Sequence, residues 1–394
     1  MQDVKLPGFS LAERDRRYQA VRHEMAARGI ECLVAPQNTG EWDACQPDAR
    51  YLTSIGGGGT AVAAVLPIDG PPIAIIRDSR RTEFWKLAQD WVTEVRATVD
   101  GRWGEALVRA LRDSGCERGT IGIAGLSGVL RNPDGTVVHN EYAALREGLP
   151  DVTIVNATDL MHDIRMVKSA EEIAMIERAQ VCADAISEAA FATARPEVTE
   201  HELYAEMMAA HIRSGGEVPA MMLIGIGAAP NQTYLLPTFR ALEASDILIC
   251  ESEIKYGGYM AQSIESLCLG PPPAAYSRLY DASLECFHML LDAARPGVPY
   301  AELIGRWEDH MKSRGFVASP TMGHGIGLGQ DGPSTRPGGD AQGRTVATGH
   351  CLILKPWATS ADGKHAIRAG NSVVVEENGA RQLGRLELAF RQLG

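Results

Sequence analysis

Two stretches of this sequence repeat each other one hundred residues apart, Ala194-Arg195-Pro196-Glu197-Val198 and Ala294-Arg295-Pro296-Gly297-Val298. The same register continues later in both copies, at Glu202-Leu203 with Glu302-Leu303 and at Gly215 with Gly315. Each stretch is typical of a helix end, a turn and a new helix. A shared turn motif alone would not keep its register as far as the last glycine. We therefore expect a duplicated αβ half, with two copies about a pseudo-twofold axis and a site at the seam between them.

Helix and strand signals extend this duplicated region in both directions. Ser169-Ala170-Glu171-Glu172 has the pattern of a capping box, in which Ser169 and Glu172 satisfy each other's backbone donors. Apolar residues then recur at helical spacing as far as Pro196. β-rich sequence follows each pair of helices, and we expect strands at 246–253, 266–269, 351–354 and 372–376.

The first ~150 residues alternate helix and strand signals, as α/β domains do. A polar helix is expected over 11–28, followed by strands at 32–35, 61–66, 73–76, 120–123 and 151–155. The run Gly56-Gly57-Gly58-Gly59 lacks the context of a phosphate-binding loop, so we expect a turn between strands there. The length and pattern predict two domains, residues 1–160 and 161–394.

The composition is that of a globular protein, with 45% hydrophobic and 22% charged residues. Fifty acidic and 38 basic side chains give a net charge of −12, which argues against binding nucleic acid or an anionic membrane. No apolar run approaches the ~20 residues that span a bilayer, and the first residues lack a signal peptide's basic and apolar regions. The eight cysteines include no CxxC pair, as expected of reduced thiols. We expect a cytoplasmic protein with a small-molecule substrate.

Four motifs follow one another along the chain. They are Arg165-Met166-Val167-Lys168-Ser169-Ala170-Glu171-Glu172, Ser245-Asp246-Ile247-Leu248-Ile249 followed by Tyr256-x-Gly258-Tyr259, Gly323-His324-Gly325-Ile326-Gly327-Leu328, and Val373-Val374-Val375-Glu376-Glu377-Asn378-Gly379. In order and spacing they resemble the creatinase, prolidase and methionine aminopeptidase family, over essentially the whole chain. The resemblance implies an α/β (α+β) fold, in which a smaller creatinase-type N-terminal α/β domain precedes a pita-bread domain with duplicated αβ halves. It also implies a homodimer.

The resemblance also marks the positions at which peptidase members hold two metal ions with two aspartates, one histidine and two glutamates. Here these positions hold Glu251, Gln262, His324, Lys355 and either Gly370 or Asn371. Divalent ions need several anionic oxygens, which an ammonium and a glycine do not supply. We therefore expect no metal and no cofactor, as in the metal-free branch that resembles creatinase and ectoine hydrolase.

Four residues are candidates for catalysis: Glu251, His324, Tyr234 and Lys355. Glu251 would act as a base toward water or as a nucleophile, unless it is an ordinary strand residue. His324 would donate a proton to a leaving nitrogen or orient a carbonyl, and Tyr234 is either a hydrogen-bond donor or core filler. Lys355 would pair with Glu251 structurally, bind a substrate carboxylate, or act as a base or nucleophile.

Substrate contacts are expected from Gln262, Asp331, Trp357 and Arg80. The resemblance to creatinase suggests that Arg80 binds an anionic substrate across a dimer seam, although a plain surface arginine is the simpler interpretation. The favoured function is a metal-independent hydrolase of a C–N bond, of amide, amidine or guanidino type, in a small polar metabolite. A lyase, cyclase or isomerase on the same fold and a non-catalytic binding protein are the alternatives.

Overall fold

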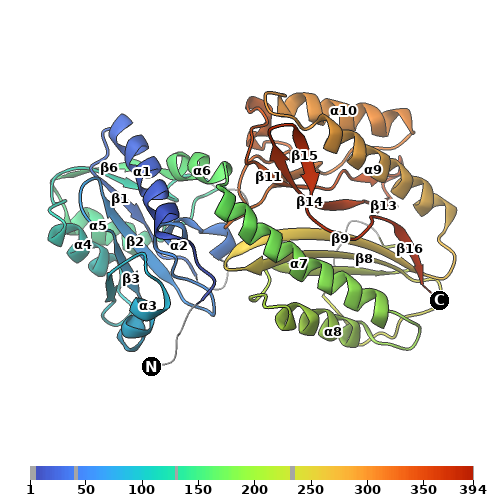
Figure 1. Ribbon diagram of the computed structural model, residues 1–394, viewed down its shortest axis with the longest axis horizontal. Helices are drawn as coiled ribbons and strands as arrows, with labels where there is room; N and C mark the ends of the chain where they lie inside the picture. The colour runs from blue at the N-terminus through green and yellow to red at the C-terminus, as the bar shows by residue number, and fades with distance from the viewer. Residues whose placement is uncertain (1–5, 40–42, 129–131, 231–235, 394) are drawn as a thin grey trace. The chain divides into compact units, whose positions relative to one another are not determined.

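The computed structural model describes residues 6–39, 43–128, 132–230 and 236–393, and the chain forms two compact units, residues 1–165 and 166–394 (Figure 1). Each unit combines helices with a β-sheet. The mixed α/β fold predicted from the sequence is confirmed.

The first unit is built on a sheet in which the described strands are ordered β4-β3-β2-β1-β5-β6, and all of them except β2 run in the same direction. Every residue of β1 and β2 is buried, as expected of central strands. The elements are α1 (Leu11–Ala27), β1 (Cys32–Ala35), α2 (Asp48–Thr53), β2 (Val62–Pro67), β3 (Ile73–Ile76), α3 (Thr82–Ala88), β4 (Glu94–Ala97), α4 (Trp103–Asp113), β5 (Gly119–Ile123), α5 (His139–Gly148), β6 (Val152–Asn156) and α6 (Thr158–Met166).

The glycine run is one place where the sequence prediction was wrong. It follows helix α2 and precedes β2, so it joins a helix to a strand rather than two strands. Gly57, Gly58 and Gly59 all have positive φ, a conformation that glycine adopts with little strain. Strand β4 was also missed, because its half-buried residues carry little apolar alternation.

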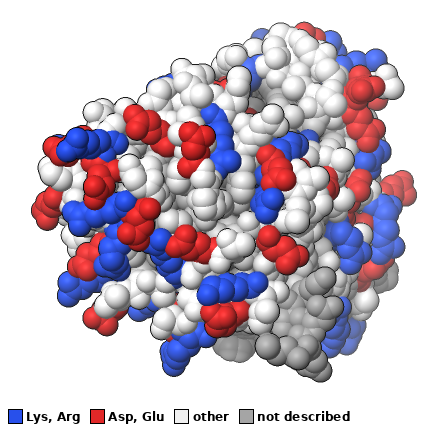
Figure 2. Space-filling model, turned by 60° about the vertical axis from the view of Figure 1, so that its left-hand side comes forward, with Lys and Arg blue, Asp and Glu red and all other residues white. Residues whose placement is uncertain are grey.

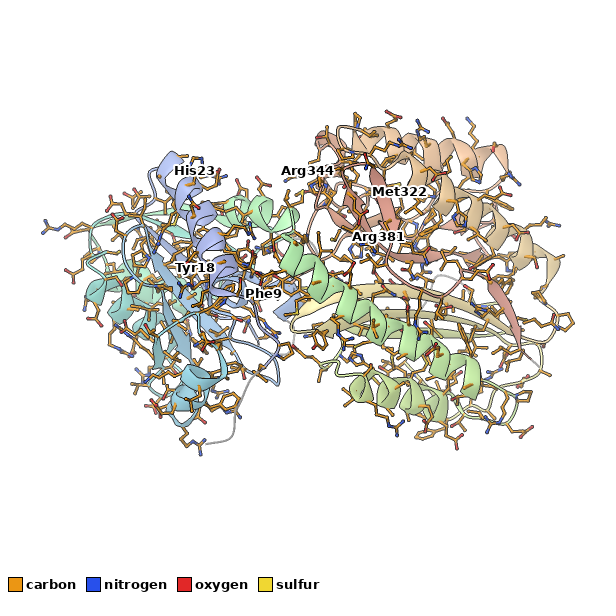
Figure 3. The ribbon with its side chains drawn as sticks, in the orientation of Figure 1. Phe9, Tyr18, His23, Met322, Arg344 and Arg381 are labelled. Carbon is orange, nitrogen blue, oxygen red and sulfur yellow. The ribbon has the colours of Figure 1, made fainter. Side chains whose placement is uncertain are left out.

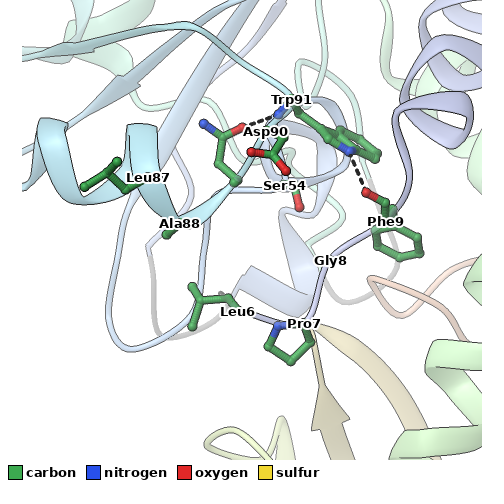
Figure 4. A pocket seen from close by; sticks show the side chains of 10 residues that line it. Leu6, Pro7, Gly8, Phe9, Ser54, Leu87, Ala88, Asp90 and Trp91 are labelled. Atoms are coloured by element: carbon green, nitrogen blue, oxygen red, sulfur yellow. Dashed lines mark hydrogen bonds between the residues drawn. The ribbon is translucent and has the colours of Figure 1, made fainter. Parts of the chain in front are cut away.

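The N-terminal segment packs against the chain that follows α3. The rings of Phe9 and Tyr18, both labelled in Figure 3, belong to this contact. They lie 5.9 Å and 6.3 Å from the ring of Trp91. The indole N–H of Trp91 donates to the carbonyl of Phe9 at 3.2 Å (Figure 4). A cavity of about 230 Å³ lies beside these contacts, between Leu6–Phe9 and Leu87–Trp91. These contacts hold residues 6–9 against the rest of the first unit.

The second unit has a larger sheet, with the described strands ordered β10-β11-β14-β9-β8-β7, while β15 pairs with β14 and β16 with β9. Its main elements are α7 (Ala170–Thr193), α8 (Glu200–Arg213), β7 (Met221–Gly227), β8 (Ile247–Tyr256), β9 (Tyr259–Leu269), α9 (Ala274–Ala293), α10 (Tyr300–Ser313), β10 (Gly323–Gly325), β11 (Cys351–Leu354), β14 (Gly370–Glu376), β15 (Gly379–Gln382) and β16 (Phe390–Leu393). The capping box at Ser169 and Glu172 is present at the start of α7.

The repeat at an offset of one hundred is present in the structure. Helices α8 and α10 have equal length and begin and end one hundred residues apart. The residue after the repeated proline has positive φ in both copies, 76° at Glu197 and 91° at Gly297. Its N–H donates to the carbonyl of Leu242 in the first copy and to that of Val346 in the second. The two halves are therefore copies of one αβ motif, as predicted.

Each half has its own apolar core. In the first half, α7 and α8 pack on β7, β8 and β9 through residues such as Ile186, Met207 and Leu248. In the second half, α9 and α10 pack with β11 and β14 through residues such as Phe287, Met311 and Val373. These two cores hold the strands that carry the candidate site.

The distribution of surface charges and the state of the cysteines agree with the amino-acid composition. Acidic and basic side chains are interspersed over the face shown in Figure 2. All eight cysteines lie in the described part of the chain, where each is buried and none forms a disulfide. Among the described residues, no helix is long and apolar enough to cross a membrane.

Candidate active site

Glu251 and Gln262 lie on the long hairpin formed by β8 and β9. Gly257 and Gly258 close this hairpin with positive φ values of 56° and 84°, which favour glycine. Register places Glu253 opposite Gln262, and side chains two residues apart on a strand share a face. Glu251 therefore faces the same side of the sheet as Gln262, and the Gln262 side-chain amide donates to its carboxylate. Both residues are buried.

Two cations from the second half converge on the carboxylate of Glu251. The ammonium of Lys355, which follows β11, lies 2.7 Å from Oε1, so the pairing implied by the resemblance is present. The guanidinium of Arg368, two residues before β14, bonds to Oε2. The Lys355 ammonium also donates to Oε1 of Gln262 at 3.3 Å. Glu251, Gln262, Lys355 and Arg368, here called the ion cluster, thus join the two halves of the unit.

The ion cluster is almost completely withdrawn from solvent. Arg368 is 0% exposed and Lys355 3%, and the Arg368 guanidinium lies 3.6 Å from the centre of the Trp357 ring. Burial pulls the pKa of the Arg368 guanidinium well below its ordinary value. The carboxylate of Glu251 and the face of Trp357 favour the charged form. Each charge in the cluster therefore depends on the others for its compensation.

His324 lies on β10, on the same face as the ammonium of Lys355. It pairs with Ile353 on β11, and Lys355 lies two residues beyond Ile353. Its Nδ1 is 2.9 Å from the carbonyl of Gly325, which assigns the ring proton to Nδ1 and makes Nε2 the basic nitrogen. The flanking glycines permit close main-chain packing, because a Cβ on Gly323 would lie 2.0 Å from the carbonyl oxygen of Ile353.

The other predicted residues are divided among different environments. Asp331 forms a buried ion pair with Lys168 at 3.2 Å, and both side chains are 1% exposed, so this carboxylate is used structurally. Arg80 lies in the first unit, pairs with Asp78 at 2.8 Å and has an 88% exposed side chain. Tyr234 lies outside the described residues.

Sequence analysis missed Arg368 and the buried pair formed by Glu253 and Gln330. The Gln330 amide nitrogen lies 2.8 Å and 2.7 Å from the two oxygens of Glu253. The available signal for Arg368 was a single arginine among small and apolar residues, in Ala366-Ile367-Arg368-Ala369-Gly370. A charged side chain in such an apolar stretch is buried only when it has an ion-pair or hydrogen-bond partner.

The side chains at the five metal-ligand positions do not fit a pair of divalent ions. Both oxygens of Glu251 are bonded to cations, which a metal ion would have to displace. A Cβ on Gly370 would lie 2.8 Å from Cβ of Lys355, so no carboxylate fits there, and Oδ1 of Asn371 accepts from the N–H of Gly384 at 2.9 Å. Among the described residues, no group of three or more histidine, cysteine or carboxylate side chains could hold a metal ion.

Comparisons with known proteins give matches in both units. The model of metallopeptidase family M24 matches residues 174–377, and that of the creatinase/prolidase N-terminal domain matches residues 17–167. The uncharacterized peptidase YqhT of Bacillus subtilis is 22% identical over 93% of this chain and 97% of its own length. The Xaa-Pro dipeptidase of Pyrococcus furiosus is 24% identical over 58% of this chain and 66% of its own length. The crystal structure of the X-Pro aminopeptidase of Thermotoga maritima shares the fold, with a TM-score of 0.79, 21% identity and coverage of 95% of this chain and 99% of that one.

These matches confirm the predicted family and pita-bread fold and correct the predicted function. The prediction of a metal-independent, creatinase-like C–N hydrolase of a small metabolite, outside the metallopeptidases, was wrong, because the family model and the named relatives are peptidases. The error came from treating the changed ligand positions as a guide to the reaction, although they describe only the metal site. With a family model that covers more than half of its length, the chain belongs to metallopeptidase family M24.

Proposed function

We propose that this chain is a peptidase that hydrolyses short peptides at a bond preceding proline. The observation that carries the proposal is the M24 family match, together with the similarity to proteins named as Xaa-Pro peptidases. The smaller first unit supports it too, because the creatinase/prolidase N-terminal domain model matches there. We assign residues 1–160 to that domain and residues 161–394 to the catalytic domain.

The proposed site is the ion cluster together with His324. Nε2 of His324 would accept the proton of the attacking water, because Nδ1 is held by the carbonyl of Gly325, and would return it to the leaving nitrogen as the C–N bond breaks. Lys355 has three N–H donors, of which two are used by Glu251 and Gln262. The third would stabilise negative charge that develops on the carbonyl oxygen of the substrate. Glu251 would position Lys355 and Arg368 rather than attack the substrate itself.

The finer features are proposals as well. We propose that the substrate is a small peptide, that the protein works as a homodimer and that it resides in the cytoplasm. Eight free, buried cysteines are compatible with a reducing compartment. Light scattering coupled to size-exclusion chromatography measures the oligomeric state, and a monomer mass would contradict the dimer.

The experiment is a cleavage assay with a panel of Xaa-Pro dipeptides and matched Xaa-Ala dipeptides. Each peptide is tested with added Mn²⁺, with added Co²⁺ and with a chelator, and the metal content of the same sample is measured. His324→Gln should lower kcat/KM for Xaa-Pro peptides by about 100-fold or more. The matched control is His288→Gln, which changes an exposed histidine on α9 and should leave turnover unchanged. Failure of the folded wild-type protein to cleave any Xaa-Pro peptide in all three conditions would refute the proposal.

A further inference from the structure

The first unit contains a hollow that is lined by arginines. Its volume is about 820 Å³, within the range of roughly 300–1,000 Å³ that is usual for sites of small ligands. Arg77, Arg80 and Arg81 contribute the cations. The same lining includes Thr39, Thr60, Ser79 and Thr98, of which Thr98 donates its hydroxyl to the main-chain carbonyl of Arg77 at 2.9 Å. The hollow is therefore rich in groups that donate hydrogen bonds.

The hollow lies at the edge of the sheet where α/β folds place their ligands. Strands β1, β3 and β4 run in the same direction, and the lining follows their carboxyl ends, with Thr39 after β1, Arg77 after β3 and Thr98 after β4. Thr60 precedes β2, which runs the opposite way and so begins at this same edge. In open α/β sheets, ligands bind outside the carboxyl ends of the strands.

The charges of the lining do not cancel. Arg80 is paired with Asp78, through contacts of 3.1 Å at Nε and 2.8 Å at Nη2. Among the described residues, the guanidinium groups of Arg77 and Arg81 have neither an ion-pair partner nor a side-chain hydrogen bond. Asp100 is the remaining acid of the lining, so the hollow keeps an excess of one positive charge in a protein whose net charge is −12.

We propose that this hollow binds a small oxyanion with two or more negative charges, either a polycarboxylate or a phosphorylated compound. A planar guanidinium matches the geometry of both carboxylate and phosphate and can bind either through two parallel hydrogen bonds. Arg77 and Arg81 supply these contacts, and the hydroxyl of Thr60 supplies a further donor. All residues of this lining belong to the first unit, whereas the residues of the proposed peptidase site belong to the second.

The test is isothermal titration of the full chain with citrate in one arm and with pyrophosphate in the other. The R77Q/R81Q double variant should bind the preferred anion at least about tenfold more weakly than the wild type. The matched control is Arg118→Gln, which changes an exposed arginine of the same unit outside the hollow and should alter Kd by less than about twofold. Raising the salt from about 50 mM to about 500 mM should weaken wild-type binding more than binding to the double variant.

The two arms identify the anion, because a carboxylate site prefers citrate and a phosphate site prefers pyrophosphate. Circular dichroism of each variant establishes that it is folded, which all three surface changes should allow. Binding that is equal in the wild type and the double variant, or that is lost equally in the Arg118→Gln control, would overturn the proposal. So would the absence of measurable binding of either anion at millimolar concentration.

Discussion

Two glutamates on the hairpin of the second unit occupy opposite faces of the same sheet. Glu251 on β8 is 6% exposed and Glu265 on β9 is 5% exposed. Glu265 lies opposite Cys250, the residue next to Glu251, so the two carboxylates point to opposite faces. Glu251 meets two cations, whereas the neighbours that act on Glu265 are the Ser187 hydroxyl, the Arg391 guanidinium and the Asp184 carboxylate. Burial is the main cause that raises the pKa of Glu265 to about 7; Asp184 acts in the same direction, and Ser187 and Arg391 oppose it.

Residue type and degree of burial therefore do not decide whether a buried carboxylate forms ion pairs or takes up a proton. Glu251 is the anionic centre of a cluster drawn from both halves of the unit. Glu265 can take up a proton near neutral pH because the effect of its burial on the carboxylate outweighs the opposing effects of Ser187 and Arg391. The neighbours that make this difference come from other elements, so substitutions at both sites can test it.

The largest effect is expected from Glu251→Gln. The change leaves Lys355 and Arg368 buried without their anion, and breaking a buried pair in this way typically costs about 3–5 kcal/mol. Urea unfolding followed by circular dichroism measures the loss, with Glu308→Gln on the exposed side of α10 as the matched control. A loss as small as that of the control would contradict the interdependence of the ion cluster.

The same substitution at Glu265 should act in the opposite direction, and only at higher pH. A carboxyl whose pKa is raised in the folded state gives most stability below its unfolded value of about 4.5, and this contribution falls as pH rises toward about 7. Glu265→Gln removes that loss, so at about pH 8 it should stabilise the protein by up to about 3 kcal/mol relative to its effect at pH 4.5.

Urea unfolding at a series of pH values between about 4.5 and 8 gives the slope of the unfolding free energy against pH, for the wild type and for Glu265→Gln. The difference in slope between the two proteins isolates the contribution of this carboxyl, since every other titrating group is shared. Parallel slopes would mean that Glu265 is not the group whose protonation is linked to folding in this range.

A smaller loss of about 2 kcal/mol is expected from Lys355→Met, because Glu251 keeps Arg368 and Gln262 as partners. The double variant E251Q/K355M should lose less than the sum of the two single variants, with a coupling energy of about 1 kcal/mol or more. Strict additivity in this cycle would show that the 2.7 Å contact contributes no coupling to stability.

The smallest effect is expected from Arg81→Gln in the first unit. Arg81 is exposed, unlike the fully buried Arg368, and surface substitutions usually change stability by less than about 0.5 kcal/mol. The midpoint of thermal unfolding, compared with that of Arg118→Gln, measures the change. A large destabilisation would assign Arg81 a structural role and weaken the case for an anion site.

Features that depend on neighbours close along the chain could be predicted from the amino-acid sequence. The capping box at Ser169, the turns after Pro196 and Pro296 and the buried strand at 32–35 are set by local backbone and side-chain chemistry, and all were located correctly. The repeat at an offset of one hundred residues predicted that the second unit contains two similar halves, because two copies of one sequence pattern fold in the same way. The motif order gave the family, which the matches confirm.

Contacts between side chains far apart in the sequence depend instead on the folded arrangement of the strands and helices. Arg368 reaches Glu251 across 117 residues of sequence, and no periodicity or spacing predicted that contact. Asp331 forms an ion pair with Lys168 and is not available as an acid. Glu251 and Glu265 are the same residue type, and they differ in the charged side chains that other strands and helices place beside them. Burial makes each such charge depend on a specific partner, and long-range folding selects that partner.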